Sequence, residues 1–76
     1  MKKTLEELAD IYEAEFSRWR GYRINKDKSE PYEIIRINAH DEAEVMAKTE
    51  RQSRALYLSR RLAIMAALHE VIKAGS

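Results

Sequence analysis

Residues 41 to 74 contain neither glycine nor proline, and this stretch ends at Gly75. Glycine and proline are the residues that helices tolerate least, so the stretch predicts one long helix, or two helices in line. Asp41, Glu42 and Glu44 would lie in its first turn, where carboxylates favour the positive end of the helix dipole. Residues 48 to 54 are polar on every side, which indicates a solvent-bridging segment or a kink. Because no breaker is present, we expect a continuous helix.

The second half of this predicted helix is the most apolar part of the chain. At a step of about 100° per residue, its large side chains cover roughly half of the circumference. A surface helix needs an apolar stripe only somewhat wider than about 100°, so we expect this helix to be covered on more than one side, by the first helix and by a second copy of the chain. The residues expected at the dimer interface are Leu58, Leu62, Met65, Leu68 and Ile72.

A first amphipathic helix is predicted over residues 4 to 20. Thr4 is a good N-cap residue, and two glutamates follow it in the first turn. Apolar side chains from Leu5 to Trp19 recur at helical spacing on one face, which places Trp19 in the core. Gly21 is a natural terminator for this helix.

Residues 21 to 38 allow two interpretations. Their isoleucines favour two strands that pair as a hairpin around residues 26 to 31. Alternatively, Ser29 caps a short helix that has Pro31 in its first turn. The predicted fold is therefore a single mainly α domain over residues 1 to 76, with an α-β-β-α or a three-helix arrangement. The first helix would pack antiparallel on the C-terminal half of the long helix.

Size and composition favour a dimer in a reducing compartment. A chain of 76 residues buries a modest share of its surface and is marginal alone, and without cysteine it has no disulfide to compensate. With 36% charged and 45% hydrophobic residues it is expected to fold. The start of the chain lacks the apolar core of a signal peptide, and residues 62 to 68, the longest apolar run, are too few to cross a bilayer. We therefore expect a cytoplasmic protein without membrane contact.

Catalytic and metal-binding constellations are weak in this sequence. His40 and Glu44 have the spacing of two metal ligands on a helix face, but no third ligand is implied. There is no glycine-rich loop, no nucleophile elbow and no paired carboxylates in a plausible cleft. We expect no catalytic residue, no metal and no cofactor, and hence a non-enzyme.

Two basic clusters are the stronger functional signal. The first lies around Trp19 and Tyr22, and the second would form a stripe along the long helix. Arginine forks pair well with phosphates and carboxylates, although the carboxylates of the first helix could equally neutralise the stripe. The residues expected to bind an acidic protein or a nucleic acid are Lys48, Arg51, Arg54, Arg61, Arg18, Arg20 and Arg23.

These features predict a small regulatory or inhibitory protein that acts by binding a larger protein partner. One alternative is a nucleic-acid-binding regulator that uses the two arginine clusters, although a net charge of +1 does not suggest binding by bulk charge. The other alternative is an assembly subunit that folds only with others.

Overall fold

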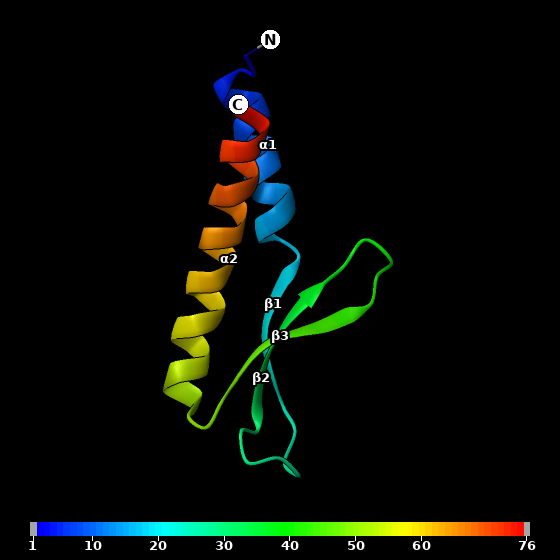
Figure 1. Ribbon diagram of the computed structural model, residues 1–76, viewed down its shortest axis with the longest axis vertical. Helices are drawn as coiled ribbons and strands as arrows, with labels where there is room; N and C mark the ends of the chain where they lie inside the picture. The colour runs from blue at the N-terminus through cyan, green and yellow to red at the C-terminus, as the bar shows by residue number, and fades with distance from the viewer. Residues whose placement is uncertain (1, 76) are drawn as a thin grey trace.

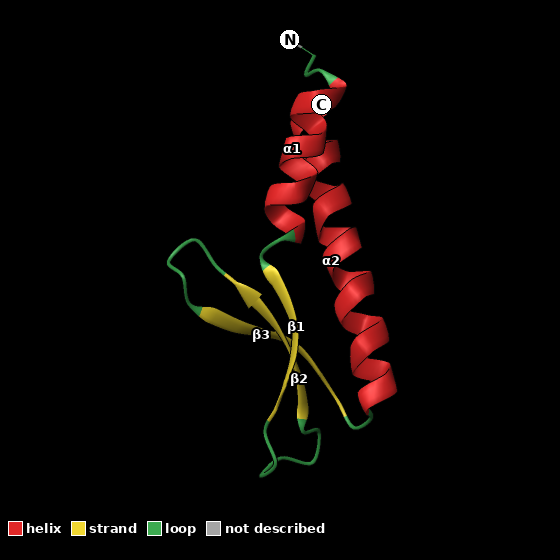
Figure 2. Ribbon diagram, turned by 180° about the vertical axis from the view of Figure 1, so that it is seen from behind, coloured by secondary structure: helices red, strands yellow, loops and turns green. Residues whose placement is uncertain are grey.

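The computed structural model describes residues 2–75, which form two helices and a three-stranded antiparallel sheet (Figure 1). The order of elements is α1 (Leu5–Phe16), β1 (Trp19–Ile24), β2 (Tyr32–Ile37), β3 (Ala43–Thr49) and α2 (Gln52–Gly75). As predicted for the first helix, α1 runs antiparallel to α2 along its C-terminal half. The sheet lies beside the N-terminal half of α2 (Figure 2).

The prediction of a mainly α fold with one helix over residues 41 to 74 is wrong. The strand β3 occupies residues 43–49 and pairs with β2 from Tyr32 opposite Thr49 to Ile37 opposite Ala43, with one irregularity between Ile34 and Ile35. Only the part of the stretch from Gln52 onward is helical. Asp41, Glu42 and Glu44 therefore do not begin a helix, and the three-helix alternative is excluded together with the long helix.

A side-chain-capped turn explains why the chain reverses before β3. The side-chain oxygen of Asn38 accepts hydrogen bonds from the backbone N–H groups of His40 and Glu42, at 2.8 and 3.0 Å. Asp41 adopts a left-handed conformation with φ of 60°, which aspartate tolerates better than most residues. This turn sets the register of β3 on β2.

The hairpin is the alternative that the structure adopts for residues 21 to 38. β1 and β2 pair antiparallel, with Tyr22 opposite Ile34. Gly21 lies at an irregularity in this pairing with φ of +84°, a conformation that glycine adopts without strain. Gly21 therefore shapes β1 and does not terminate α1.

The N-cap of α1 is confirmed, whereas its end comes earlier than predicted. The Thr4 hydroxyl accepts a hydrogen bond from the Glu7 N–H, and the Glu7 carboxylate accepts one from the Thr4 N–H, which completes a capping box. The helix ends at Phe16 with Ser17 as its C-cap. Trp19 thus begins β1 and is half-buried, so it is only partly a core residue.

The buried hydrophobic core is small and contains mostly alanine. It consists of Ile34 and Ile35 from β2 together with Ala55, Ala63 and Ala67 from α2. The small side of α2 therefore faces the rest of the protein, and its large side chains do not fill the core.

Buried charged groups join α1 to the sheet. Glu15, which is 8% exposed, accepts hydrogen bonds from Nε and Nη2 of Arg36, both at 2.8 Å. The indole Nε1 of Trp19 donates a third bond to the same carboxylate at 2.9 Å. On its other side Arg36 approaches Glu44 of β3 at 3.7 Å. This network holds the end of α1 against β1, β2 and β3.

Candidate interaction surface

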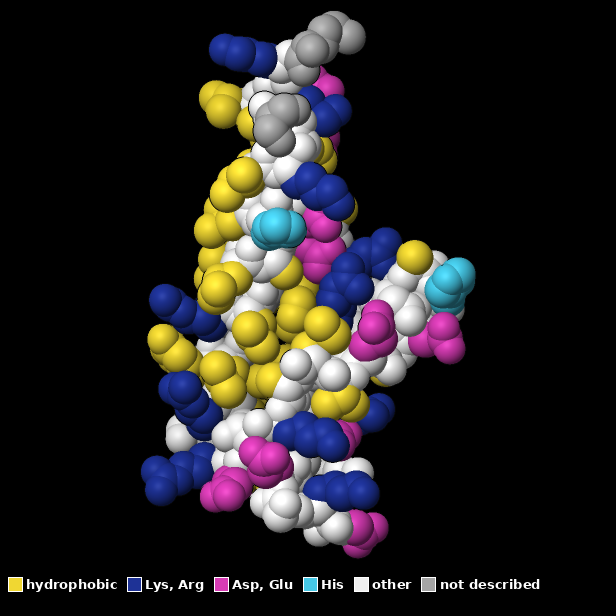
Figure 3. Space-filling model, in the orientation of Figure 1, with side chains coloured by type: hydrophobic (Ala, Val, Ile, Leu, Met, Phe, Trp, Pro, Cys, Tyr) yellow, Lys and Arg dark blue, Asp and Glu magenta, His cyan; other side chains and the backbone are white. Residues whose placement is uncertain are grey.

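The side of α2 that points away from α1 and the sheet carries a row of large apolar side chains. Ile72 is 70% exposed, Met65 58% and Leu68 48%, values that are high for such residues in a small domain. Figure 3 shows hydrophobic side chains gathered along α2, with Lys and Arg side chains beside them. We call this surface the outward face of α2. It consists of Tyr57, Ile64, Met65, Leu68 and Ile72; Leu56 is also exposed but lies on the alanine side of the helix.

The helical period explains how one helix presents both kinds of surface. At about 100° per residue, Ala55, Ala63 and Ala67 share one side of α2, and the outward face occupies the opposite side. Small side chains let α1 and β2 approach the α2 backbone closely, so the inward side needs no large residue. The large residues of the outward face consequently remain between 36% and 70% exposed.

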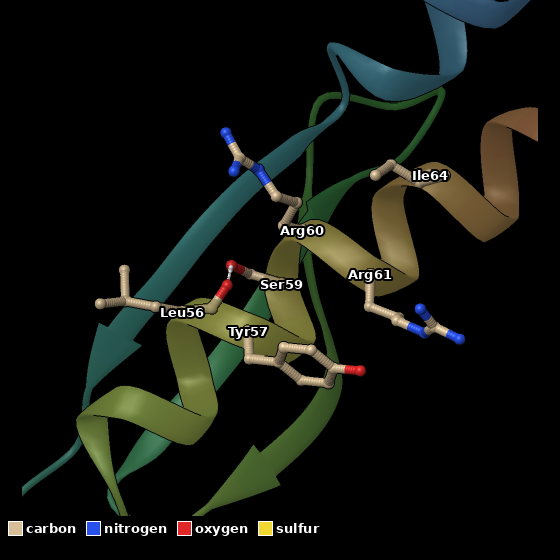
Figure 4. A pocket seen from close by; sticks show the side chains of 6 residues that line it. All are labelled: Leu56, Tyr57, Ser59, Arg60, Arg61 and Ile64. Carbon is tan, nitrogen blue, oxygen red and sulfur yellow. Dashed lines mark hydrogen bonds between the residues drawn. The ribbon is translucent and has the colours of Figure 1, made fainter.

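A shallow depression of about 650 Å³ lies on the N-terminal half of α2, at the edge of this face (Figure 4). Tyr57, Arg61 and Ile64 line one part of it, and Leu56, Ser59 and Arg60 line the other. All six residues belong to α2, so no second element closes the depression. Small-molecule pockets are concave and enclose most of their ligand, so this open depression fits a side chain of a protein partner better.

Arginines border the apolar residues of the outward face. The guanidinium of Arg54 lies 5.4 Å from the ring centroid of Tyr57, in the range of a cation–π contact. Arg60 and Arg61, one helical turn after Tyr57, are both exposed. The face therefore combines a basic, aromatic N-terminal half with an aliphatic C-terminal half.

The total exposed surface is large for a chain of this mass. The accessible area is 5922 Å², whereas a compact monomer of 8.9 kDa is expected to expose about 4,800 Å². The radius of gyration of 14.2 Å also exceeds the value of about 11 Å expected for this length. The fold thus leaves about 1,100 Å² more surface in contact with water than compact monomers do.

The residues predicted for a dimer interface divide between the two sides of α2. Met65, Leu68 and Ile72 lie on the outward face, whereas Leu58 and Leu62 are half-buried. Sequence reasoning omitted Tyr57 and Ile64 from the interface. Tyr57 and Ile64 belong to the same apolar arc, so the helical period could have identified those two.

The basic residues predicted to bind a partner do not form two clusters. Lys48 lies on β3 opposite Glu33, and Arg23 of β1 pairs with the same Glu33 at 3.0 Å, so the predicted stripe along one helix is wrong. Arg18, between α1 and β1, is half-buried and donates a hydrogen bond to the Ile37 carbonyl at 3.3 Å. The other four predicted arginines are exposed. Arg51 directly precedes α2, Arg54 and Arg61 lie on α2, and Arg20 lies on β1.

Local charge pairs follow the sheet. The hydrogen bond from Arg23 holds the pKa of the Glu33 carboxyl below its ordinary value, against the opposing effect of desolvation. Arg36 likewise lowers the pKa of Glu15, and this pairing raises the pKa of Arg36. Glu15, the buried carboxylate of α1, therefore neutralises Arg36. Within residues 2–75, no ion pair joins α1 to Arg51, Arg54 or Arg61, so the carboxylates of α1 do not neutralise these arginines.

The remaining features offer little for chemistry. His40 lies in the β2–β3 turn and Glu44 on β3, so these two residues do not share a helix face. In the described part of the chain, no three His, Cys, Asp or Glu side chains are grouped to hold a metal. A smaller hollow of about 220 Å³ between α1 and α2 is lined by Ile11, Ala14, Glu15, Arg18 and Glu70, and Glu15 already serves the network with Arg36.

Neither α1 nor α2 has the length and apolar character that a membrane-spanning helix needs. No protein-family model, curated protein sequence or solved structure matches this chain.

Proposed function

We propose that this chain is a small non-catalytic regulatory protein that acts by binding a protein partner through the outward face of α2. The observation that carries the proposal is the exposure of five large apolar side chains along that one helix face. Exposed apolar residues scattered singly are normal on protein surfaces, whereas a contiguous row on one element is typical of a protein interface.

The chemistry of this face favours a protein over a nucleic acid. Its residues include an aromatic ring, a methionine and three neighbouring arginines, which are residue types enriched at protein interfaces. A nucleic-acid surface would need cations gathered into one stripe, but Lys48 and Arg23 lie on the sheet beside Glu33.

Affinity capture with matched variants tests this proposal. The wild-type chain, Leu68→Glu and Met46→Glu are immobilised and exposed to an extract of the source cells, with and without nuclease. Leu68 is 48% exposed on the outward face, and Met46 is 44% exposed on β3, so the two substitutions disturb residues of similar exposure. The captured protein is then purified, and its affinity for each chain is measured by calorimetry.

We expect Leu68→Glu to weaken binding more than about tenfold, because burying an unpaired charge costs well over 1.4 kcal/mol. Met46→Glu should retain wild-type affinity. Equal affinity of all three chains would refute the outward face as the binding surface. Loss of the complex on nuclease treatment would point to nucleic acid as the partner.

A further inference from the structure

We infer that the partner covering the outward face of α2 is a second copy of this chain, and that the two α2 helices pair antiparallel. This inference rests on the proposed function and names the partner of the same surface. Tyr57, Ile64, Met65, Leu68 and Ile72 of each copy would form the contact.

The exposed area matches what such a pairing removes from water. The chain exposes about 1,100 Å² more than a compact monomer of its mass. A stable protein interface of standard size buries about 800 Å² on each partner. One interface on α2 would therefore bring the accessible area of each copy close to the value that compact proteins of this size reach.

The small core gives a reason for the chain to need its own copy. Only Ile34 is a fully buried large side chain within residues 2–75, and the other completely buried side chains are alanines. A domain of this size has little apolar burial to offset its chain entropy, and association is a common remedy. A second copy is always present wherever the chain is made, whereas an unrelated partner is not.

The spacing of the exposed residues suits a helix pair. Tyr57 and Ile64 are separated by seven residues, as are Arg61 and Leu68, which is the repeat by which one helix keeps the same side toward another. The seam continues to Ile72 through nearly the whole of α2. With the two-fold axis near Ile64, Tyr57 of one copy would lie beside Ile72 of the other.

Charge selects the antiparallel orientation over the parallel one. In a parallel pair, Arg54, Arg60 and Arg61 would each lie at the same level as their equivalents, and like charges would meet across the contact. In an antiparallel pair, the basic N-terminal half of each α2 lies beside the aliphatic C-terminal half of the other. There the arginines approach the negative end of the partner helix dipole.

Cross-linking between single-cysteine variants tests both the partner and the orientation, since the natural chain has no cysteine. Tyr57→Cys and Ile72→Cys are purified, one of them with a mass tag, and oxidised mildly, each alone and mixed. A disulfide needs Cα atoms within about 7 Å, whereas the fifteen-residue step from Tyr57 to Ile72 spans about 22 Å along the helix. Met46→Cys mixed with Ile72→Cys is the control.

We expect the mixture of Tyr57→Cys and Ile72→Cys to form a mixed cross-linked dimer, while each variant alone and the control mixture stay uncross-linked. Efficient cross-linking of Ile72→Cys with itself would show a parallel pair and overturn the inference. A lack of cross-linking in every combination would overturn the second copy as partner. In that case, capture of a different protein that depends on Leu68 would still support the proposed function.

Discussion

Replacing Glu15 by glutamine should destabilise the junction between α1 and the sheet. The glutamine keeps the shape of the side chain but removes the charge that faces Arg36, which donates two hydrogen bonds of 2.8 Å to the carboxylate. Removing one partner of a buried ion pair typically costs about 3–5 kcal/mol, because the remaining charge is left unpaired in a low-dielectric site. The Arg36 side chain is 24% exposed and keeps Glu44 at 3.7 Å, so the loss should be at or slightly below the lower end of that range. We expect the free energy of unfolding to fall by about 2–3 kcal/mol.

The same substitution should change how stability depends on pH. The pKa of Glu15 is lower in the folded protein than its ordinary value of 4.5, chiefly because Arg36 donates hydrogen bonds to the ionised form. Above the ordinary pKa, Glu15 is ionised in both the folded and the unfolded chain, and its stabilising effect is complete. As the pH falls below this value, the carboxyl is protonated first in the unfolded chain, and the stabilising effect is lost by the time the pH has passed through the folded pKa. The free energy of unfolding of Glu15→Gln should therefore decrease less between neutral and acidic pH than that of the wild type.

Urea denaturation followed by circular dichroism, repeated at several pH values and one protein concentration, measures both effects. Glu44→Gln is the control, because the Glu44 side chain is 48% exposed and lies 3.7 Å from Arg36; exposed pairs of this kind contribute at most about 1 kcal/mol. Equal stabilities of Glu15→Gln and Glu44→Gln at neutral pH would refute the argument that Glu15 anchors α1.

Three further substitutions test the backbone and the core. Gly21→Ala should lower the free energy of unfolding by about 1–2 kcal/mol through backbone strain at positive φ alone, because no atom beyond the adjacent residues lies within 4 Å of the added Cβ. Gly75→Ala, where the space is equally open, should cost less than about 0.5 kcal/mol. Equal urea midpoints for these two variants would contradict this reasoning. Ala67→Leu should lower the thermal midpoint by overpacking a completely buried position, at a cost of about 1–3 kcal/mol, and an unchanged midpoint would mean that α2 is not closely packed there. Ile34→Ala should cost about 2–5 kcal/mol in denaturant titrations, and Ile24→Ala, at 55% exposure, clearly less; the reverse order would contradict the assignment of the core.

The sequence predicted the elements that depend on local signals. Thr4 and Glu7 carry the capping signal of α1 within four residues. The isoleucines of β2 favoured a strand but left a short helix as an alternative. The helical part of residues 52–75 also followed from its pattern and from the lack of breakers. The boundary at Phe16 was less accessible, because the apolar spacing continues to Trp19 and only the sheet shows that Trp19 begins a strand.

The strand β3 could not be predicted with the same reasoning because non-local pairing decides it. Residues 43–49 include Ala, Glu, Met and Lys, which all favour helices, and contain no breaker. Pairing with Ile34 and Ile35 of β2 outweighs that preference. The available hints were the β-branched Val45 and Thr49 and the tendency of Asn38 to cap a turn.

The interaction surface was only half predictable for a related reason. Both sides of α2 are apolar, one with alanines and one with large residues, so periodicity identifies two usable faces without saying which one points inward. The expectation that large residues fill the core is reversed here, since Ala63 and Ala67 are buried while Met65 and Leu68 are exposed. The positions of the basic residues likewise depended on β3, which carries Lys48 away from α2.

Sedimentation equilibrium of the purified chain at several concentrations tests most directly whether a second copy covers the outward face of α2. We predict that the wild type and Met46→Glu approach twice the chain mass of 8.9 kDa as concentration rises. Leu68→Glu should remain at the mass of one chain with an unchanged circular dichroism spectrum, because Leu68 is 48% exposed in the single chain and its replacement leaves the fold intact. A wild-type chain that stays folded at 8.9 kDa at every concentration, or a Leu68→Glu variant that associates as the wild type does, would contradict the account.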